Sequence, residues 1–564
     1  MLKSIIHTKS TLVIAVLLAA CSSPEQQADS RPTDNRPNIL IILADDLGFS
    51  DLGSYGGEIQ TPNIDQLAYN GIRFTQFYNT SRCCPTRASL LTGLYPHQAG
   101  IGRMTFDTGK PGYRGFLKDN TVTIAEVLKD AGYKTGMTGK WHVSETERLE
   151  KEDQLKWLAH QADFAPFSDT ASYPTARGFD KYYGNIWGVV DYFDPFSLVN
   201  GKEPVTSVPD DFYYTDAITD STVAYIDQFS KTDQPFFIYM AQTAPHWPLH
   251  ARPEDIAKYE DRYRNGWQDL REERYARMTK MGLLDSTTTS LADWQFPEIN
   301  WAENENKTWD SRAMAVHAAM VDRMDQGIGK VLDKLEALGE LDNTIIVFLS
   351  DNGASYERPS KYGPGFDRAG STRSGKEVHF PVGKEEEYLP GPQTVHAGIG
   401  PQWAHTANTP FKFWKSKVFE GGICTPMIVH WPEGIAASNT INTTPGHVMD
   451  LMATCIDAAG ASYPESFNGK QITPLQGKSL IPVLTGNVRQ DHEYLFWEHF
   501  NSKAIRKGKW KLVQLNPNTE WELYNLDIDR TEADDVASEN PELVEELKQK
   551  WEEMANNLEV YPAP

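Results

Sequence analysis

Oxygen-bearing side chains follow two apolar segments, residues 39–44 and residues 345–349, which we expect to form buried strands. They are Asp45, Asp46, Asp351 and Asn352. Carboxylates and an amide without a Cys/His cluster are hard ligands, which suit Ca²⁺ or Mg²⁺ better than structural Zn²⁺. Because ligands of open α/β sheets bind beyond the carboxyl ends of the strands, we expect a divalent-cation site there.

Cationic or chargeable side chains follow two further expected strands. Residues 236–240 lead through a short turn to His246, and residues 133–138 lead to Lys140 and His142. Each side chain alone would be more typical of a turn or a structural role, but their shared place at strand ends favours one site. Such groups beside a divalent cation predict an anionic substrate group of the phosphate or sulfate kind.

Two adjacent cysteines, Cys83 and Cys84, precede a predicted helix. Pro85 and the apolar residues after it indicate a helix that begins at about residues 84–86. Cys83 then lies at the positive end of the helix, which favours a bound anion. The alternative is a thiolate nucleophile of low pKa, which gives no reason for a metal.

The segment that begins at Cys83 resembles the signature of the formylglycine-dependent (type I) sulfatases, in the bacterial arylsulfatase-like branch of the alkaline phosphatase superfamily. The shared pattern is Cys83-x-Pro85-x-Arg87 followed by Leu90-Leu91-Thr92-Gly93. The resemblance extends over about residues 36–555. Further motifs in the family's order are Pro37-Asn38-Ile39, Asp45-Asp46, Gly139-Lys140-Trp141-His142, Arg177-Gly178-Phe179-Asp180, Pro245-His246, Asp351-Asn352-Gly353 and Glu420-Gly421-Gly422.

This resemblance implies an enzyme that hydrolyses a sulfate ester to an alcohol or phenol and inorganic sulfate. A formylglycine-generating or sulfatase-maturating enzyme would first oxidise Cys83, rather than Cys84, to Cα-formylglycine. The hydrated aldehyde, a gem-diol, would then attack sulfur. One cation, Ca²⁺ in preference to Mg²⁺, would be bound by Asp45, Asp46, Cys83, Asp351 and Asn352.

The resemblance also implies roles for the other polar side chains. Arg87 and Lys140 would hold the formylglycine, and Asp351 would accept a proton from the attacking hydroxyl. His142 would take the proton of the second hydroxyl and so expel sulfate. The residues expected to contact the sulfate group are His246 and Lys415, which precedes Glu420 by five residues as in the family pattern.

The substrate class stays open between an aryl sulfate and a sulfated carbohydrate. Trp403 and His405 are candidates to line its pocket, and Glu498, His499 and Arg506 either reach the substrate or lie on surface loops. One alternative function is a phosphate or phosphonate monoester hydrolase of the same superfamily. The other is a non-catalytic lipoprotein that binds sulfated glycans. A single metal site and a complete catalytic set favour the sulfatase over both.

Apolar runs that alternate with helical patterns predict an α/β fold with a large mixed, mostly parallel sheet flanked by helices, as in alkaline phosphatases. The clearest expected parallel strands are Ile39–Ala44, Phe236–Met240, Ile345–Leu349 and Met427–His430. The expected helices are Thr123–Ala131, Asp216–Phe229, Arg312–Leu338 and His447–Ala459. Long loops are expected at about residues 143–177, 251–310 and 354–408, as walls or lids of the site.

The pattern changes after about residue 485. The strand-like segments Tyr494–Phe500, Trp510–Gln514 and Trp521–Leu526 precede a helix at Pro541–Ala555. They predict a smaller α+β domain that carries a short antiparallel sheet and a helix. We therefore expect a sulfatase catalytic domain over residues 37–485 and a C-terminal domain over residues 486–564.

The first residues of the chain are typical of an exported lipoprotein. Lysines, a short apolar stretch and Leu18-Ala19-Ala20-Cys21 indicate a signal peptide over residues 1–21 that ends at a lipobox cysteine, Cys21. Residues 22–36 then form a polar tether. Because Ser22 follows the cysteine, we expect an outer-membrane anchor in the periplasm or at the cell surface, with no contact to the membrane beyond the lipid.

The chain is acidic, with 54 Lys and Arg against 77 Asp and Glu and a net charge of −23. This balance argues against a nucleic-acid-binding protein, which would carry a basic excess. Residues 520–560 alone hold 14 acidic and 3 basic side chains, so much of the excess lies far along the chain from the expected site. Of the remaining cysteines, Cys424 and Cys455 form either a disulfide or two buried thiols.

Overall fold

The computed structural model describes residues 34–146, 167–360, 372 and 376–564. Residues Arg36–Pro564 form one compact unit. The predicted signal peptide with Cys21, and most of the tether, lie outside the described residues, so the lipoprotein anchor stays a prediction. The boundary between residues 485 and 486 also stays a prediction.

A ten-stranded sheet forms the centre of this unit, in the order β11-β2-β10-β9-β1-β8-β4-β5-β6-β7. Its central strand β1 (Asn38–Asp45) pairs in parallel with β8 (Phe236–Pro245) and with β9 (Thr344–Ser350). The next strand, β4 (Lys134–Gly139), runs parallel to β8. The remaining strands are β2 (Ile72–Phe74), β5 (Lys181–Asn185), β6 (Leu198–Asn200), β7 (Glu203–Pro204), β10 (Met427–His430) and β11 (Thr440–Asn442). The predicted mixed, mostly parallel sheet is confirmed.

One strand direction differs from the expectation. β10 runs antiparallel to both of its neighbours, β9 and β2, although its apolar run predicted a parallel strand. The chain enters β10 at the carboxyl edge of the sheet, because Met427 pairs with Leu349 near the end of β9. The strand must therefore run back along the sheet, and burial on both faces gives it the same composition as a parallel strand.

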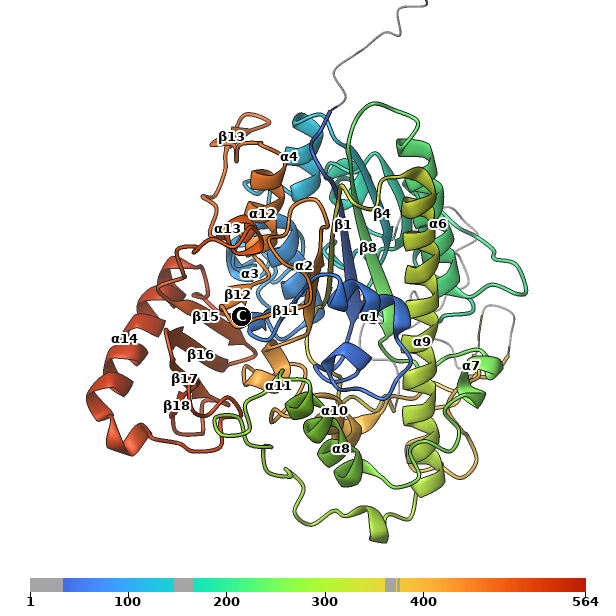
Figure 1. Ribbon diagram of the computed structural model, residues 1–564, viewed down its shortest axis with the longest axis vertical. Helices are drawn as coiled ribbons and strands as arrows, with labels where there is room; N and C mark the ends of the chain where they lie inside the picture. Colours follow the sequence, from blue (N-terminus) through green and yellow to red (C-terminus); the bar gives the residue numbers. More distant parts are fainter. Residues whose placement is uncertain (1–33, 147–166, 361–371, 373–375) are drawn as a thin grey trace, which may run out of the picture. The chain divides into compact units, whose positions relative to one another are not determined.

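Alternating side chains of the central strand face two layers of helices. Leu40, Ile42 and Ala44 belong to the buried cluster that includes residues of α1, α6 and α9, whereas Ile39, Ile41 and Leu43 belong to the cluster that includes residues of α2, α4 and α12. This follows from the two-residue period of a strand. Figure 1 shows α6 and α9 on one side of β1, β8 and β4, with α2, α4 and α12 on the other.

The predicted helices are present with shifted ends. The long helices are α6 (Tyr214–Phe229), α8 (Trp267–Lys280) and α9 (Lys307–Leu338). Other helices are α1 (Pro62–Tyr69), α2 (Cys83–Thr92), α3 (Pro96–Ala99), α4 (Ile124–Asp130), α7 (Pro253–Ala257), α10 (Gly400–Ala407), α11 (Glu420–Ile423), α12 (Asp450–Ala458) and α13 (Ile481–Leu484). The stretch 251–310 was expected to be a loop but contains α7 and α8, because its polar α8 has too few apolar residues to show a helical period.

The C-terminal part forms a separate four-stranded antiparallel sheet, as predicted. Its strands are β15 (Leu495–His499), β16 (Ser502–Lys507), β17 (Trp510–Gln514) and β18 (Glu522–Asn525), and the helix α14 (Pro541–Asn557) packs beside it. The sequence did not predict β16 as a strand of its own. Two short pairs complete the sheets, namely β3 (Phe77–Tyr78) with β12 (Gly446–His447) and β13 (Ser466–Phe467) with β14 (Lys470–Gln471).

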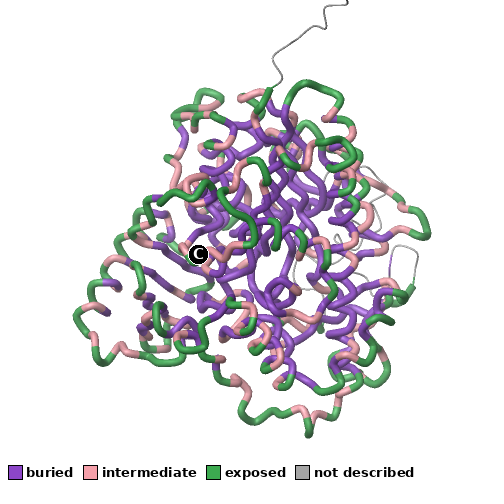
Figure 2. Tube along the Cα trace, in the orientation of Figure 1, coloured by how far each residue is buried: buried purple, intermediate pink, exposed green. Residues whose placement is uncertain are grey.

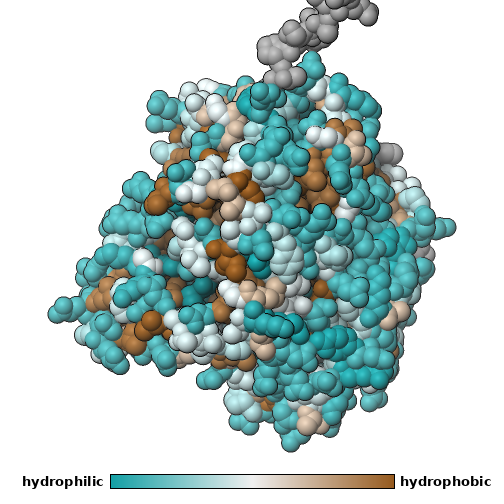
Figure 3. All heavy atoms as spheres, in the orientation of Figure 1, coloured by the Kyte–Doolittle hydropathy of each residue, from teal (hydrophilic) through white to brown (hydrophobic). Residues whose placement is uncertain are grey.

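Buried residues run through the central sheet, and the exposed ones lie on the outer loops and helices (Figure 2). Cys424 and Cys455 are buried free thiols, so the disulfide alternative is wrong. The face in Figure 3 is mostly hydrophilic, with hydrophobic side chains in small scattered groups. Within the described ranges, no helix has the length and apolar character needed to cross a membrane.

Candidate active site

The carboxyl ends of four neighbouring strands bring the predicted residues together. Asp45 ends β1, Asp351 follows β9, His246 follows β8 and Lys140 follows β4. The strand ends are level, because Asp45 pairs with Pro245 and the residue before Asp45 pairs with Ser350. The strand-end prediction therefore holds in three dimensions, and the site lies where open α/β sheets bind ligands.

Each cationic side chain of the site faces a buried carboxylate. Lys140 Nζ lies 2.7 Å from Asp45 Oδ2, and Arg87 Nη2 lies 2.9 Å from Asp351 Oδ2. Arg87 also donates to the backbone carbonyl of Lys140 at 2.8 Å. All four side chains are almost completely buried. Water does not screen these charges, so each cation interacts strongly with the carboxylate that it faces.

A second set of contacts centres on Asp46. Lys415 Nζ lies 2.7 Å from Asp46 Oδ1, and the Asn352 amide donates to the same oxygen at 2.6 Å. His246 Nε2 lies 3.5 Å from Asp46 Oδ2. Lys415, which the sequence assigned through the family spacing to Glu420, thus lies in the site. Asp46 and His142 have left-handed backbones, with φ of 68° and 54°, and such backbone strain in non-glycine residues concentrates at functional sites.

Cys83 is the first residue of α2, with only 2% of its surface exposed. The helix begins one residue earlier than the sequence predicted. A hydrogen bond from the Cys84 thiol lowers the pKa of Cys83 well below its usual value, and the charges of Lys140 and Lys415 add to this against the effect of burial. The helix N-terminus and these cations therefore make position 83 a place for negative charge.

The acidic residues of the site fit a bound cation. Burial together with the neighbouring charge of Asp45 raises the pKa of Asp351 well above its usual value. Asp45 Oδ1 and Asn352 Oδ1 are buried without a hydrogen-bond partner among the described residues. Like charges and unpaired oxygens inside the fold are costly unless a cation neutralises them. Carboxylate and amide oxygens are the ligands that hard divalent cations take.

The two histidines of the site are neutral at pH 7. Burial lowers the pKa of His142 to about 4, and burial also lowers the pKa of His246. A neutral imidazole can accept a proton, which the predicted role of His142 requires. His246 is oriented through its Nδ1, which lies 2.5 Å from the backbone carbonyl of Trp247.

The sequence did not identify two charged residues beside this cluster. Glu357 accepts a hydrogen bond from Arg82 at 3.1 Å and another from the Trp247 indole at 3.0 Å, and its Oε2 lies 3.6 Å from Lys415 Nζ. A small hollow next to Asp46 is lined by Glu357 and Trp247. Glu357 lies in the stretch 354–408, whose length was the only sequence signal for it.

Trp403 and His405 lie in an aromatic cluster. Both are fully buried; Trp403 contacts Trp267 at a ring distance of 6.1 Å, and His405 stacks on Trp294 at 5.2 Å. The Trp403 indole donates to the backbone carbonyl of Asp310. Their substrate contact stays a prediction, and this geometry favours a packing role.

The C-terminal candidates lie in strands. Glu498 and His499 belong to β15 and Arg506 to β16, and all three are buried. Glu498 pairs with His97 at 2.9 Å, and Arg506 donates to Tyr78 Oη at 2.6 Å. Surface-loop positions for these residues are therefore wrong, because β15 and β16 form a buried sheet there.

A separate cavity of about 750 Å³ has none of the predicted site residues in its lining, which includes Phe193, Arg312 and Lys376. The chemistry is instead concentrated at the strand ends. Buried carboxylates, cations and neutral histidines at the end of a doubly covered α/β sheet are compatible with hydrolysis of an anionic ester beside a divalent cation.

The sulfatase family model matches residues 37–461, and the model for the C-terminal region of N-sulphoglucosamine sulphohydrolase matches residues 411–557. The chain is 32% identical to an uncharacterized sulfatase of Schizosaccharomyces pombe, over 93% of this chain and 94% of that one. It is 31% identical to the arylsulfatase of Klebsiella aerogenes, over 84% and 96%. The solved structure of Ps i-CgsB in complex with k-i-k-neocarrahexaose superimposes with a TM-score of 0.61 at 25% identity, over 94% and 98%.

The chain belongs to the sulfatase family of the alkaline phosphatase superfamily and is a sulfuric ester hydrolase. The family resemblance, the fold and the reaction predicted from the sequence are thereby confirmed. Sulfatases generally use formylglycine and a divalent cation, and the residues described above fit both.

Proposed function

We propose that this sulfatase uses a formylglycine made from Cys83 and one Ca²⁺ ion to release sulfate from a sulfated carbohydrate. The observation that carries the proposal is the position of Cys83, which is buried at the start of α2 and faced by Lys140, His142 and Lys415. An anionic ester and an oxygen nucleophile at residue 83 can meet there under cationic charge.

The proposed Ca²⁺ ligands are Asp45, Asp46, Asp351 and Asn352, together with residue 83. When bound, the ion supplies positive charge that polarises the ester and lowers the pKa of an oxygen nucleophile. Ca²⁺ is proposed ahead of Mg²⁺ because Mg²⁺ usually keeps several waters, whereas this site offers several protein oxygens close together.

The converted residue 83 would supply a hydrated aldehyde, which offers one hydroxyl for attack and a second for release of the product. Arg87, held by Asp351 and by the carbonyl of Lys140, fixes the position of both neighbours. Asp351 can accept the proton of the attacking hydroxyl. His142 is neutral and can accept the second proton.

Two side chains are proposed to bind the sulfate group and assist the departing oxygen. Lys415 and His246 both lie against Asp46, whereas Lys140 pairs with Asp45. Burial alone would lower the pKa of Lys415, but Asp46 and Glu357 raise it. The ammonium is therefore charged at pH 7 and can stabilise negative charge on oxygen.

A carbohydrate is favoured over an aryl group on two grounds. Ps i-CgsB, whose fold is similar, is solved with an oligosaccharide. In this chain the half-buried Trp247 adjoins the charged pair of Arg82 and Glu357. An aromatic face next to hydrogen-bonding groups suits a sugar ring, which has apolar faces and a polar rim. An aryl sulfate remains the alternative, because the Klebsiella aerogenes relative is an arylsulfatase.

We further propose that the enzyme is exported and anchored by a lipid on Cys21. The support is the sequence of residues 1–36 alone. The anchor would place the enzyme in the periplasm or at the cell surface, where polymeric sulfated carbohydrates are encountered.

The test measures the chemical state of residue 83 and the release of sulfate. In protein made together with a maturation enzyme, mass spectrometry of the peptide around Arg82–Arg87 should show Cys83 as an aldehyde and Cys84 as a thiol. Cys83→Ala should abolish release of sulfate from nitrophenyl sulfate, because it removes the nucleophile. Cys455→Ala, a buried cysteine in α12, is the matched control and should keep activity. Activity in Cys83→Ala would contradict the mechanism.

The substrate class is tested separately. A panel of sulfated monosaccharides and oligosaccharides should include a substrate with a kcat/KM above that of nitrophenyl sulfate. Nitrophenyl phosphate, the control for the alternative ester chemistry, should be turned over more slowly than the sulfate. Preference for nitrophenyl sulfate over every sugar in the panel would replace the carbohydrate by an aryl substrate.

A further inference from the structure

Cys84 is a buried thiol beside the reactive cysteine that the sulfatase mechanism does not use. It follows Cys83 in the first turn of α2, and 0% of its surface is exposed. Its Sγ lies 3.4 Å from the backbone carbonyl of Arg103 and 3.9 Å from Met104 Sδ.

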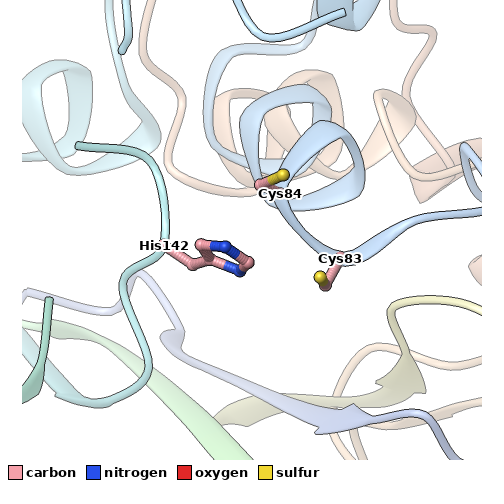
Figure 4. Close-up of side chains that lie close together, drawn as sticks. All are labelled: Cys83, Cys84 and His142. Atoms are coloured by element: carbon pink, nitrogen blue, oxygen red, sulfur yellow. The ribbon is translucent and has the colours of Figure 1, made fainter. Parts of the chain in front are cut away.

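Three potential ligand atoms lie together at this place. The sulfurs of Cys83 and Cys84 and a ring nitrogen of His142 all lie within 4.8 Å of one another, and all three residues are buried. Figure 4 shows both thiols at the start of the helix and the imidazole coming from the loop opposite. Nδ1 of His142 has no hydrogen-bond partner among the described residues.

This geometry is close to that of a thiolate–imidazole metal site. Tetrahedral Zn²⁺ with Zn–S bonds of about 2.3 Å holds two sulfurs about 3.8 Å apart, so small rotations of the side chains would suffice. Two thiolates and an imidazole select soft cations, and the Met104 thioether next to Cys84 adds to that character.

The set differs in its ligand atoms from the group at the strand ends, although residue 83 borders both. That group, Asp45, Asp46 and His246, is dominated by carboxylate oxygens. Oxygen ligands favour hard cations such as Ca²⁺, whereas sulfur ligands do not. The same pocket thus contains two sets of ligands with opposite selectivity, of which the sulfur set exists only while Cys83 is a thiol.

We propose that the unconverted, folded chain binds one thiophilic cation, for which Zn²⁺ is the probe, through Cys83, Cys84 and His142. Binding forms two metal–sulfur bonds and one metal–nitrogen bond, and the two thiols release their protons to solvent. The metal stays divalent and no atom is oxidised. Conversion of Cys83 removes one ligand, and a bound cation in turn withholds the Cys83 sulfur from oxidation. This second statement rests on the proposed formylglycine at residue 83.

The experiment uses the full chain produced without a maturation enzyme, titrated with Zn²⁺ against a chromogenic chelator. One equivalent should bind, and an excess of Ca²⁺ should not displace it. With Co²⁺ in place of Zn²⁺, absorption bands of sulfur-to-metal charge transfer should appear. Cys84→Ala and His142→Gln should each weaken Zn²⁺ binding by about 10- to 100-fold or more, because each removes a ligand. Cys455→Ala is the matched control and should bind as the parent chain does.

Fully converted protein, identified by the mass of its residue 83, should bind Zn²⁺ at this site at least tenfold more weakly than the unconverted chain. Unchanged Zn²⁺ affinity in both Cys84→Ala and His142→Gln, with unfolding midpoints equal to that of the parent chain, would overturn the proposal. Equal affinity of converted and unconverted protein would do the same. Failure of the proposed function would give a different result. Residue 83 would then remain a thiol under every condition, and Zn²⁺ binding to the unconverted chain could still be measured.

Discussion

Glu357 joins three side chains at the edge of the proposed sulfate pocket. It pairs with Arg82, accepts the Trp247 indole proton and lies 3.6 Å from Lys415. Burial would raise its pKa, but the charges of Arg82 and Lys415 hold the pKa well below its usual range. The carboxylate is therefore ionised at every working pH and acts as a fixed counter-charge for two cations.

Glu357→Gln should lower kcat/KM for the best sugar sulfate by about 10- to 100-fold, because misplacement of binding groups by small distances has effects of this size. Steady-state kinetics would measure kcat/KM and KM. The relative change in KM should exceed the relative change in the midpoint of unfolding. Glu386→Gln, an exposed carboxylate in the same stretch of chain, is the matched control and should leave both unchanged. A loss of stability without a change in KM would show that Glu357 is only structural.

Asp51 forms a buried charge cluster behind the site. Its carboxylate lies 2.8 Å from Arg274 Nη1 and 3.0 Å from His317 Nε2. Burial would raise the pKa of Asp51, yet His317 and Arg274 hold it at about 2, below the usual 3.8. The folded pKa is depressed, so the stability that this carboxylate contributes is present above about pH 4 and is lost as the pH falls through about 2.

Asp51→Asn should therefore lower the free energy of unfolding by about 3–5 kcal/mol near neutral pH, because it removes the buried carboxylate that pairs with Arg274 and contacts His317. The difference from the parent chain should shrink by about 2 kcal/mol between about pH 5 and pH 2, which corresponds to the pKa shift. Urea unfolding at several pH values measures both. A difference that does not depend on pH would contradict the assignment of this stability to the ionised carboxylate.

At the scale of strands and helices, the sequence predicted the part of the site that depends on local pattern. Asp45 and Asp351 follow uninterrupted apolar runs, so the strand ends and their convergence could be inferred from burial and sheet geometry. Lys415 was found only through the spacing of a known family. Glu357 could not be inferred, because no local pattern places it and a long loop brings it to the site.

The direction of β10 and the position of Trp403 also could not be predicted from local sequence pattern. Burial on both faces makes an antiparallel strand within a parallel sheet look like its neighbours in composition. An aromatic residue near a site motif is equally typical of a pocket wall and of a buried cluster. Only the packing of α8 against α10, which brings Trp267 against Trp403, distinguishes the two for this chain.

A buried charge network connects the C-terminal sheet to the segment that carries Lys415. Lys511 of β17 lies 2.9 Å from Glu420 and 2.8 Å from Glu532, and the backbone N–H of Glu420 donates to Glu532. Glu420 begins α11, five residues after Lys415. The C-terminal sheet thus fixes one end of the loop that presents a proposed sulfate-binding lysine.

Lys511→Met should lower the free energy of unfolding by about 3–5 kcal/mol, since it removes the cation that two buried carboxylates share and leaves Glu420 paired with Arg530 alone, at 3.4 Å. The double variant Lys511→Met/Glu532→Gln should cost less than the sum of the single variants, because the groups interact directly. Lys509→Met, an exposed lysine two residues earlier, should change stability by less than about 0.5 kcal/mol. Strict additivity in the double variant would exclude the network as the source of the stability.

For the whole molecule, the net charge of −23 is compatible with an anionic substrate because the charges are separated in space. The site gathers Arg87, Lys140 and Lys415 inside the fold. The acidic excess of residues 520–560 includes the exposed side of α14, which is rich in glutamate. Screening over about 8 Å at physiological salt keeps such surface charges from acting on a buried pocket at greater distance.

One hydrophobic cluster extends from the central sheet into the C-terminal part. Leu40 of β1, Trp497 of β15 and Trp551 of α14 all belong to it. The Trp497 indole donates to the backbone carbonyl of Asn79 at 2.7 Å, four residues before Cys83. The C-terminal sheet therefore packs directly on the segment that leads into the reactive cysteine.

A chain that ends at residue 485 should consequently fail to fold, whereas the chain Arg36–Pro564 should unfold in one cooperative transition with activity intact. The shortened chain would expose the apolar surface that Trp497 and its neighbours cover, and it would lose the partners of Glu420 and Tyr78. Calorimetry and gel filtration of both chains measure this, with sulfate release as the second readout. A soluble, cooperatively unfolding chain 36–485 that keeps its activity would instead support two independent domains and would confine the role of β15–β18 to the surface.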